Sequence, residues 1–185
     1  MNAFFLDRDG VINRERADYV KTWDEFEFLP NVLPALQRLA TLSIPIFVIS
    51  NQSAIGRGLV SRETVDMIHQ RARLRIEAAG GRIDGFFVCP HHPDENCHCR
   101  KPKPGLLFAA AAQCNLNLAT CRLIGDAVTD LQAAQAAGCQ SILVESGRQG
   151  GQLRNLLSTN PTVSIAPDLA SAVEMILSLG PRNHV

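Results

Sequence analysis

The sequence predicts an α/β fold in which an open parallel sheet is flanked by helices. Short apolar runs of strand length alternate with longer segments of helical period, which is typical of a parallel sheet with helices on its faces. The chain has 185 residues, of which 46% are hydrophobic and 19% charged, so it is long enough to bury one core without staples. We therefore expect a single domain over residues 1–185.

The predicted strands are apolar runs of five to seven residues, with a shorter and weaker run near the C-terminus. In chain order they cover residues 3–7, 44–50, 85–89, 121–126, 141–145 and 163–166.

The predicted helices lie between these runs. The first carries an apolar face that includes Leu36 and Leu39, and Ser61 is a suitable N-cap for the second. The helices are expected at residues 31–42, 62–80, 104–113, 129–137, 149–157 and 168–179.

Composition excludes several classes of protein. Lysine and arginine together equal the acids at 18 each, so no basic excess favours a nucleic-acid partner. No apolar run is long enough to span a membrane. The first nine residues already contain two acids and an arginine, which does not fit a signal peptide, and we expect a cytoplasmic protein. We also expect a monomer.

Four polar or metal-binding residues fall at or just after the ends of predicted strands: Asp7, Ser50, Cys89 and Asp126. Ligands bind beyond the carboxyl ends of the strands in open parallel sheets, so these residues predict one shared site. Each motif alone has a simple structural explanation. An Asp-x-Asp-Gly turn satisfies its own backbone, and an acid in the first turn of a helix, such as Asp130, stabilises that helix.

The segment "CPHHPDENCHC" contains two pairs of metal-binding residues. Cys89 and His91 form a C-x-H pair, and Cys97 and Cys99 form a C-x-C pair five residues further on. Zinc takes four nitrogen or sulfur ligands, and three thiolates with one imidazole make a closed structural set. The segment therefore predicts a structural zinc site.

Other interpretations of this segment fit less well. His92 and His98 compete with His91 as the fourth ligand, but the C-x-H spacing favours His91. A redox function is weakened by the lack of a C-x-x-C motif. A nucleic-acid knuckle would need interleaved aromatic residues and a basic excess.

In their order and spacing the motifs resemble those of the haloacid dehalogenase-like phosphohydrolases. The resemblance extends over nearly the whole chain and rests on "LDRDGVIN", "SNQS", the cysteine and histidine segment, "CRKPKPG" and "GDAVTDLQAA". It implies a Rossmann-like sheet and a magnesium-dependent phosphatase. No insertion is long enough for a separate cap domain, so we expect an open site in which loops select the substrate.

The resemblance implies a mechanism through an aspartyl-phosphate. Asp7 would be the nucleophile and Asp9 the general acid and base. Magnesium would bind the Asp7 carboxylate, the Asp9 backbone carbonyl and Asp126. Lys101 would neutralise the phosphoryl oxygens. For Asp130 we expect orientation of Lys101 or helix capping in preference to metal ligation.

The family's motifs, together with the loops beside them, indicate which residues would meet the phosphate and the substrate. Ser50 and the Asn51 N–H would donate hydrogen bonds to the phosphoryl group, while Arg57 or Arg100 would meet a second phosphate. The remaining expected contacts are Gln52, Ser53, Asp18 and Tyr19. The zinc site, which ends next to Arg100, would orient the phosphate-binding cations.

Two substrates and one non-catalytic function remain open. "QSAIGRG" favours the branch of the family that removes the 7-phosphate of D-glycero-D-manno-heptose 1,7-bisphosphate. The short spacing from His91 to Cys97 is shared with histidinol-phosphate phosphatases, which are the alternative. Ala127 is a departure, because heptose enzymes can carry a substrate-contacting lysine at this position. A zinc-stabilised binding domain without catalysis is the third possibility.

Overall fold

The computed structural model describes residues 2–153, 155 and 163–178. Six parallel strands form one sheet in the order β3-β2-β1-β4-β5-β6. Every predicted strand is present, within two residues of its predicted ends. The strands are β1 (Phe4–Leu6), β2 (Ile46–Asn51), β3 (Gly85–Cys89), β4 (Arg122–Gly125), β5 (Gln140–Val144) and β6 (Ser164–Ala166).

The predicted helices are also found where the structure describes them. They are α1 (Val32–Ala40), α3 (Arg62–Ala78), α4 (Gly105–Cys114), α5 (Val128–Ala136), α6 (Gly150–Leu153) and α8 (Leu169–Ser178). The end of the helix expected at 149–157 lies largely outside the described residues. The sequence analysis missed α2 (Ser53–Gly56), because a four-residue helix directly after a strand has no period to detect.

Three 3-10 turns were also not predicted. They are η1 (Trp23–Glu25), η2 (Pro93–Glu95) and η3 (Leu118–Thr120). Each spans three residues within a connecting loop, which is too short for a periodic pattern.

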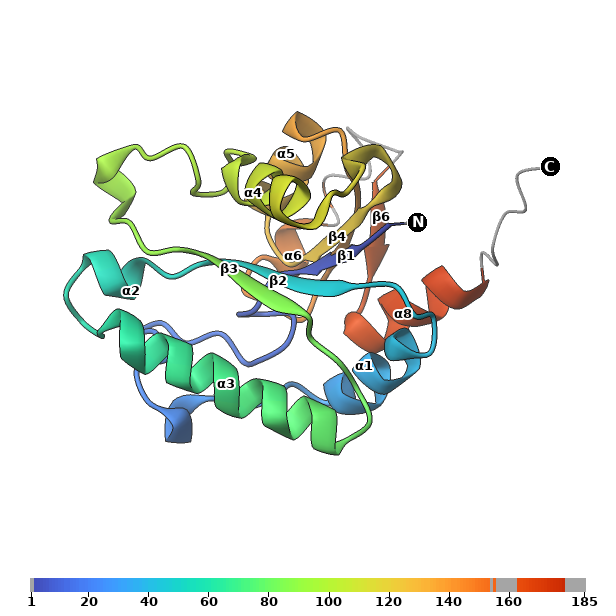
Figure 1. The fold of residues 1–185 in the computed structure, drawn as a ribbon, viewed down its shortest axis with the longest axis horizontal. Coiled ribbons are helices and arrows are strands. Elements are labelled where there is room, and N and C mark those ends of the chain that lie inside the picture. Colours follow the sequence, from blue (N-terminus) through green and yellow to red (C-terminus); the bar gives the residue numbers. More distant parts are fainter. Residues whose placement is uncertain (1, 154, 156–162, 179–185) are drawn as a thin grey trace.

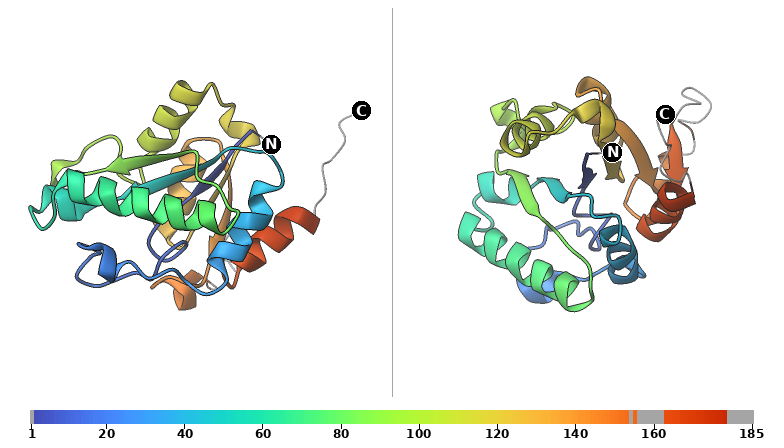
Figure 2. Two further views of the ribbon diagram at one scale, coloured as in Figure 1. Left: turned by 60° about the horizontal axis from the view of Figure 1, so that its bottom comes forward. Right: turned by 45° about the vertical axis from the view of Figure 1, so that its right-hand side comes forward.

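Both faces of the sheet are covered, which explains why its strands are apolar throughout. In β1, Phe4 and Leu6 pack in the same cluster as α1, α3 and α8, whereas Phe5 packs in the cluster that contains α4 and α5. Figures 1 and 2 show these two helical layers on opposite sides of the sheet. The fold class predicted from the sequence is confirmed.

The topology creates one crevice where the direction of winding reverses. From β1 the chain proceeds to β2 and β3 on one side of the sheet, and later to β4, β5 and β6 on the other. Adjacent strands β1 and β4 therefore send their following loops in opposite directions, and ligands bind at such a point. Asp7 and Asp126 follow directly after these two strands.

The loops beyond the carboxyl edge carry the remaining candidates. The segment that follows β3 leads through η2 to α4 and contains the predicted zinc ligands. Within the described part of the chain, the strands are joined by helices and loops with no inserted cap domain. No described helix is both long enough and apolar enough to cross a membrane.

Candidate active site

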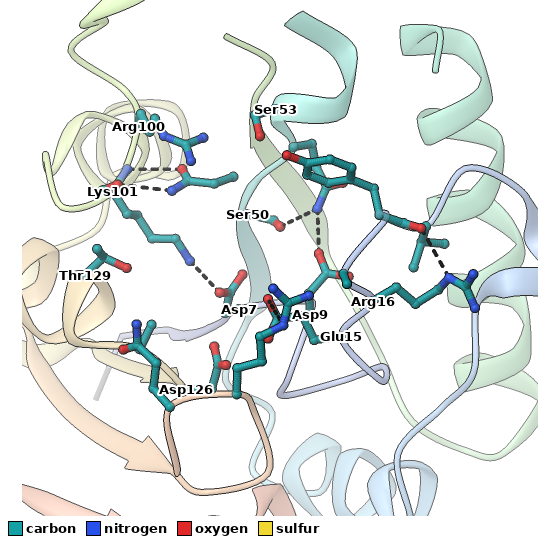
Figure 3. Close-up of a pocket in the computed structure, with 18 of the residues that line it drawn as sticks. Asp7, Asp9, Glu15, Arg16, Ser50, Ser53, Arg100, Lys101, Asp126 and Thr129 are labelled. Atoms are coloured by element: carbon teal, nitrogen blue, oxygen red, sulfur yellow. Dashed lines mark hydrogen bonds and ion pairs between the residues drawn. The ribbon is translucent and has the colours of Figure 1, made fainter. Parts of the chain in front are cut away.

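A pocket of about 590 Å³ opens at the carboxyl edge of the sheet. Figure 3 shows carboxylates at its floor and cations along its walls. Among the predicted site residues outside the cysteine and histidine segment, all line this pocket except Asp18 and Asp130. Of the four strand-end residues from which one shared site was predicted, Asp7, Ser50 and Asp126 line the pocket, whereas Cys89 belongs to a separate group of cysteines and a histidine.

Asp7 is paired with Lys101 at the floor of the pocket. The Lys101 Nζ lies 2.8 Å from Asp7 Oδ2 and 2.6 Å from Asp130 Oδ1, and it donates to the Ile49 carbonyl. Lys101 is 3% exposed and Asp130 is fully buried. Burial alone would lower the pKa of Lys101, but the two carboxylates raise it, so the side chain stays charged.

Asp130 contacts both Lys101 and the start of its own helix, α5. One carboxylate oxygen pairs with Lys101, and the other accepts a hydrogen bond from the Ala127 N–H at the start of α5. These are the two contacts that the sequence analysis preferred for Asp130. We call Asp7, Asp126, Asp130 and Lys101 the carboxylate cluster.

The carboxylate cluster has room and charge for a cation. Carboxylate oxygens of Asp7, Asp126 and Asp130 lie within 4.8 Å of one another, and three acids face one lysine. Burial and the neighbouring carboxylates raise the pKa of Asp126 to about 8, and burial raises that of Asp7 to about 6 despite Lys101. A divalent cation would relieve this repulsion, and an all-oxygen donor set suits magnesium.

Two glycines leave space for Asp126. Gly10 has φ +81° and Gly147 follows β5, and a Cβ atom on either would collide with the Asp126 carboxylate. The backbone therefore closes around this side chain, which is 6% exposed.

Asp9 is held by three donors. Its Oδ1 accepts from Arg8 Nη2 at 2.8 Å and Asn13 Nδ2 at 2.9 Å, and its Oδ2 accepts from Gln52 Nε2 at 2.8 Å. Burial alone would raise the pKa of Asp9, but the Arg8 guanidinium and these hydrogen bonds hold it below its usual value. Asp9 is therefore a carboxylate in this conformation.

The residues at the end of β2 and the start of α2 form two groups of contacts. Ser50 Oγ accepts from Gln52 Nε2 at 2.9 Å, and Ser53 begins α2 beside them. Asn51 exchanges two 3.1 Å hydrogen bonds with the backbone of Lys101, so its side chain fixes the loop that carries the lysine. This contact of the Asn51 side chain was not foreseen, because it joins positions fifty residues apart.

Of four residues expected to contact the substrate, three line the pocket and one does not. Tyr19, Arg57 and Arg100 line the pocket, whereas Asp18 is exposed and pairs with Lys21. Hydrogen bonds from Lys21 and Arg16 lower the pKa of Asp18 to about 2.

Three rim residues were missed by the sequence analysis. Glu15 and Arg148, which form an ion pair of 3.3 Å, line the pocket together with Arg16. Glu15 and Arg16 lie in the loop after the first motif, which also carries the expected contacts Asp18 and Tyr19. Arg148 follows β5, a strand for which no motif was recognised.

Two buried residues behind Asp9 were missed as well. Arg8 is 2% exposed and His69, on α3, is 3% exposed, and their side chains meet at 3.3 Å. Burial and the Arg8 charge lower the pKa of His69 to about 3, so its ring is neutral. A cation between two acids at the end of an apolar strand was a usable signal for Arg8. No local signal pointed to His69.

The cysteine loop, Cys89–Cys99, brings its four predicted ligands together. The Sγ atom of Cys97 lies 3.6 Å from that of Cys89 and 3.5 Å from that of Cys99, and His91 Nδ1 lies 3.2 Å from Cys99 Sγ. Tetrahedral zinc with sulfur at about 2.3 Å would place its ligand atoms roughly 3.7 Å apart. The four side chains therefore fit such an ion after a small expansion.

The two other candidates for the histidine ligand, His92 and His98, are not in the described group of ligand atoms. His92 Nδ1 accepts from the Asp94 N–H and caps η2. His98 is not in the described cluster of ligand atoms. Burial and the neighbouring thiols raise the pKa of Cys99 to about 12, whereas hydrogen bonds outweigh burial at Cys97 and lower its pKa to about 7. A metal cation would allow the thiols to ionise together.

The cysteine loop is packed against the sheet and the pocket. The Gln52 N–H donates to the Cys89 carbonyl at 2.8 Å, and the Gly56 N–H donates to the Pro90 carbonyl at 2.7 Å. A Cβ at Gly105 would strike the backbone of Cys99. The end of the loop therefore has a fixed position, and Arg100 and Lys101 follow it directly.

Comparison with known proteins places this site in a family. A family model described as HAD-hydrolase-like matches residues 98–172. The D-glycero-beta-D-manno-heptose-1,7-bisphosphate 7-phosphatase of Bordetella bronchiseptica is 37% identical over 183 residues, covering 96% of this chain and 98% of that protein. The D-glycero-alpha-D-manno-heptose-1,7-bisphosphate 7-phosphatase of Mycobacterium tuberculosis is 40% identical over 156 residues, covering 80% and 82%.

Solved structures agree with this similarity. The crystal structure of D,D-heptose 1,7-bisphosphate phosphatase from B. bronchiseptica, complexed with magnesium and phosphate, superposes with a TM-score of 0.88 at 37% identity. The superposition covers 97% of this chain and 99% of the B. bronchiseptica chain. Fold and site thus define a phosphohydrolase. The chain belongs to the haloacid dehalogenase-like hydrolase family, among the heptose-bisphosphate phosphatases.

Proposed function

We propose that this chain removes the 7-phosphate of D-glycero-D-manno-heptose 1,7-bisphosphate, using magnesium and an aspartyl-phosphate intermediate. The observation that carries the proposal is the placement of Asp7 against Lys101, beside Asp126, at the reversal point of the sheet. The similarity to heptose-bisphosphate phosphatases over nearly the full chain supports the choice of substrate.

In the first step an Asp7 oxygen attacks phosphorus in line, and the bond to the sugar oxygen breaks. Lys101, which already contacts Asp7, neutralises the charge that develops on the phosphoryl oxygens. Ser50 and the Asn51 N–H donate hydrogen bonds to the same group. Asp9, a carboxylate in the free protein, takes up a proton from solvent when the substrate binds and gives it to the departing oxygen, so the sugar leaves as an alcohol.

In the second step water replaces the sugar. Asp9, now a carboxylate, takes a proton from the water that attacks the phosphoryl group on Asp7. Free phosphate is released and Asp7 is regenerated, which makes one difficult hydrolysis two easier steps.

Magnesium would be held by the Asp7 carboxylate, the Asp9 carbonyl and Asp126. When bound, it supplies positive charge between the nucleophile and the phosphate. Asp130 stays with Lys101 and orients it. The repulsion among the buried acids supports this assignment.

Zinc in the cysteine loop would be structural. Three thiolates and one imidazole fill its coordination, which leaves no position for a reacting water. In this proposal the zinc fixes the segment from which Arg100 and Lys101 extend. Arg100 and Arg57, both on the wall of the pocket, meet the second phosphate.

The substrate is tested by comparing kcat/KM for both anomers of heptose 1,7-bisphosphate with kcat/KM for histidinol phosphate. We expect kcat/KM for one of the bisphosphate anomers to exceed that for histidinol phosphate by at least about 10-fold, because only a bisphosphate uses Arg57 and Arg100. A preference for histidinol phosphate would refute the substrate assignment.

Catalysis itself is tested with Asp7→Asn. Phosphate release should fall by about 10³-fold or more, since the nucleophile is lost. Asp18→Asn, an exposed acid outside the pocket lining, is the control and should keep full activity. A binding domain that had only retained the fold would release no phosphate in the presence of magnesium, even without a substitution.

The proposal also includes a monomer in the cytoplasm that binds neither nucleic acid nor membranes. Light scattering on the zinc-loaded protein checks the first point, and fractionation of cells checks the second. A stable dimer or a membrane-bound fraction would correct these assignments.

A further inference from the structure

Behind the pocket lies a group of buried polar side chains that the proposed mechanism does not use. Arg8 and His69 are 2% and 3% exposed, and neither lines the pocket. A guanidinium is costly to bury unless its donors are paired. The partners of Arg8 therefore indicate what the cation does.

Arg8 points from the first motif to Asp9. Its Nη2 donates to Asp9 Oδ1 at 2.8 Å, and its Nη1 meets His69 Nε2 at 3.3 Å. The ring of His69 stacks on Phe86 of β3, with centroids 4.4 Å apart and planes within 6°. A histidine held in this way fixes Arg8 from behind.

The two carboxylate oxygens of Asp9 accept different numbers of hydrogen bonds. A carboxylate offers about four acceptor positions, two on each oxygen. Oδ1 accepts from both Arg8 and Asn13, so its two positions are filled, whereas Oδ2 accepts from Gln52 alone among the described residues. One acceptor position therefore remains, and it is on Oδ2.

We infer that Arg8, held by His69, is a positioning residue that directs the proton chemistry of Asp9 to Oδ2. This inference rests on the proposed role of Asp9 as general acid and base. Arg8 touches neither the substrate nor the reacting atoms, and it acts by orienting the carboxylate.

The test uses the difference between two leaving groups. When the phosphorus–oxygen bond breaks, a sugar alkoxide needs the proton of Asp9, whereas 4-nitrophenolate leaves without one. In Arg8→Met, kcat/KM for the sugar bisphosphate should fall about 10- to 100-fold, while kcat/KM for 4-nitrophenyl phosphate should change less than about 3-fold. Equal losses on both esters would overturn the inference, because general damage to the site does not distinguish leaving groups.

Conservative variants cover the case in which Arg8→Met does not fold. Arg8→Lys keeps the charge, and His69→Phe keeps the stack on Phe86 without the nitrogen. Both should show the same selective loss, but smaller. His69→Gln, whose amide oxygen can accept from Arg8, should restore most of it. Arg14→Met, which breaks the exposed pair with Glu27, is the control and should show no selective loss.

A crystal structure of Arg8→Lys gives a readout without catalysis. We expect Asp9 to rotate away from Asn13 or to adopt two conformations. An Asp9 that stays in place would overturn the inference, whatever the activity. A wild-type protein that hydrolyses neither ester would refute the proposed function, while this structural result would still decide the role of Arg8.

Discussion

The carboxylate cluster and the cysteine loop both gather ionisable groups, but different parts of the fold hold them. Asp7 lies more than a hundred positions before Asp126 and Asp130, and the sheet brings the three acids together. The cysteine loop takes four ligands from eleven consecutive residues. The carboxylate cluster includes a cation, Lys101, which pairs with Asp7. The ligand group that the structure describes in the cysteine loop consists of three cysteines and one histidine and includes no lysine or arginine.

This difference indicates which parts depend on a metal. The cluster should keep its geometry without magnesium, because strand pairing and Lys101 hold it. The cysteine loop has no regular structure apart from the short η2 turn, so its geometry should depend on zinc. The predictions below test that contrast.

Among the substitutions that test this contrast, the largest effect is expected for Lys101→Met. Asp7 and Asp130 would lose the cation between them, so kcat/KM should fall about 10²- to 10³-fold. The free energy of unfolding should fall by about 3 to 5 kcal/mol, because two buried carboxylates lose their partner. Enzyme assays and urea unfolding measure the two quantities.

A second substitution separates stability from catalysis in this variant. Asp130→Asn, added to Lys101→Met, should restore stability but not activity, since it removes one unpaired charge without replacing the cation. Lys103→Met is the matched control, because Lys103 is exposed and contacts Asn96. Equal losses in Lys103→Met would argue against a specific role of Lys101.

The contrast also explains what the sequence could predict. Asp7, Asp126 and the cysteine loop were found because each has a local signature: a strand end, or a ligand spacing within a few residues. Lys101 and Asp130 were predicted as well, but other residues that hold the site were not. His69 contacts Arg8 across 61 positions, and the Asn51 side chain contacts Lys101 across 50. Such contacts depend on how helices and loops pack on the sheet, which no short pattern reports.

The cysteine loop is tested with Cys97→Ser. Zinc content, measured by mass spectrometry, should fall from one equivalent to well below it. The melting temperature should fall by roughly 5 to 10 °C, or about 2 to 3 kcal/mol for a chain of this length. Cys114→Ser, on α4 outside the cluster, should change neither quantity. Unchanged stability in zinc-free protein would show that the cysteine loop does not depend on zinc.

A smaller effect is expected from acid. The pKa of His69 is lowered to about 3 by burial and by Arg8, with Arg62 adding to this and Asp9 opposing it. An unfolded histidine titrates near 6.5. Between these values the unfolded chain binds the additional proton, so stability is lost as the pH falls from about 6.5 towards 3. From pH 7.5 to 5 the loss is about 2 kcal/mol.

Acid also weakens a metal bound by thiolates, so the contribution of His69 must be isolated. His69→Gln cannot take up the proton in the unfolded state. The fall in its free energy of unfolding between pH 7.5 and 5 should therefore be about 2 kcal/mol smaller than the fall in the wild type. Parallel curves for the two proteins would show that the acid effect belongs to the cysteine loop.

The smallest effect concerns the junction of the two regions. Asn51→Ala removes both side-chain hydrogen bonds to the Lys101 backbone but keeps the Asn51 N–H. We expect kcat/KM to fall about 5- to 10-fold, or about 1 kcal/mol. The Lys101 backbone is then restrained by the cysteine loop, while the side chain keeps its contacts with Asp7, Asp130 and the Ile49 carbonyl.

Combining Asn51→Ala with Cys97→Ser decides whether the two restraints act on the same segment. If both hold the Lys101 backbone, removing either one releases it in part, and the double variant should lose less activity than the sum of the single losses in free energy. Additive losses would mean that the cysteine loop stabilises the chain without orienting Lys101. In that case zinc would support the fold, and Asn51 would be the residue that connects β2 to the backbone of the phosphate-binding lysine.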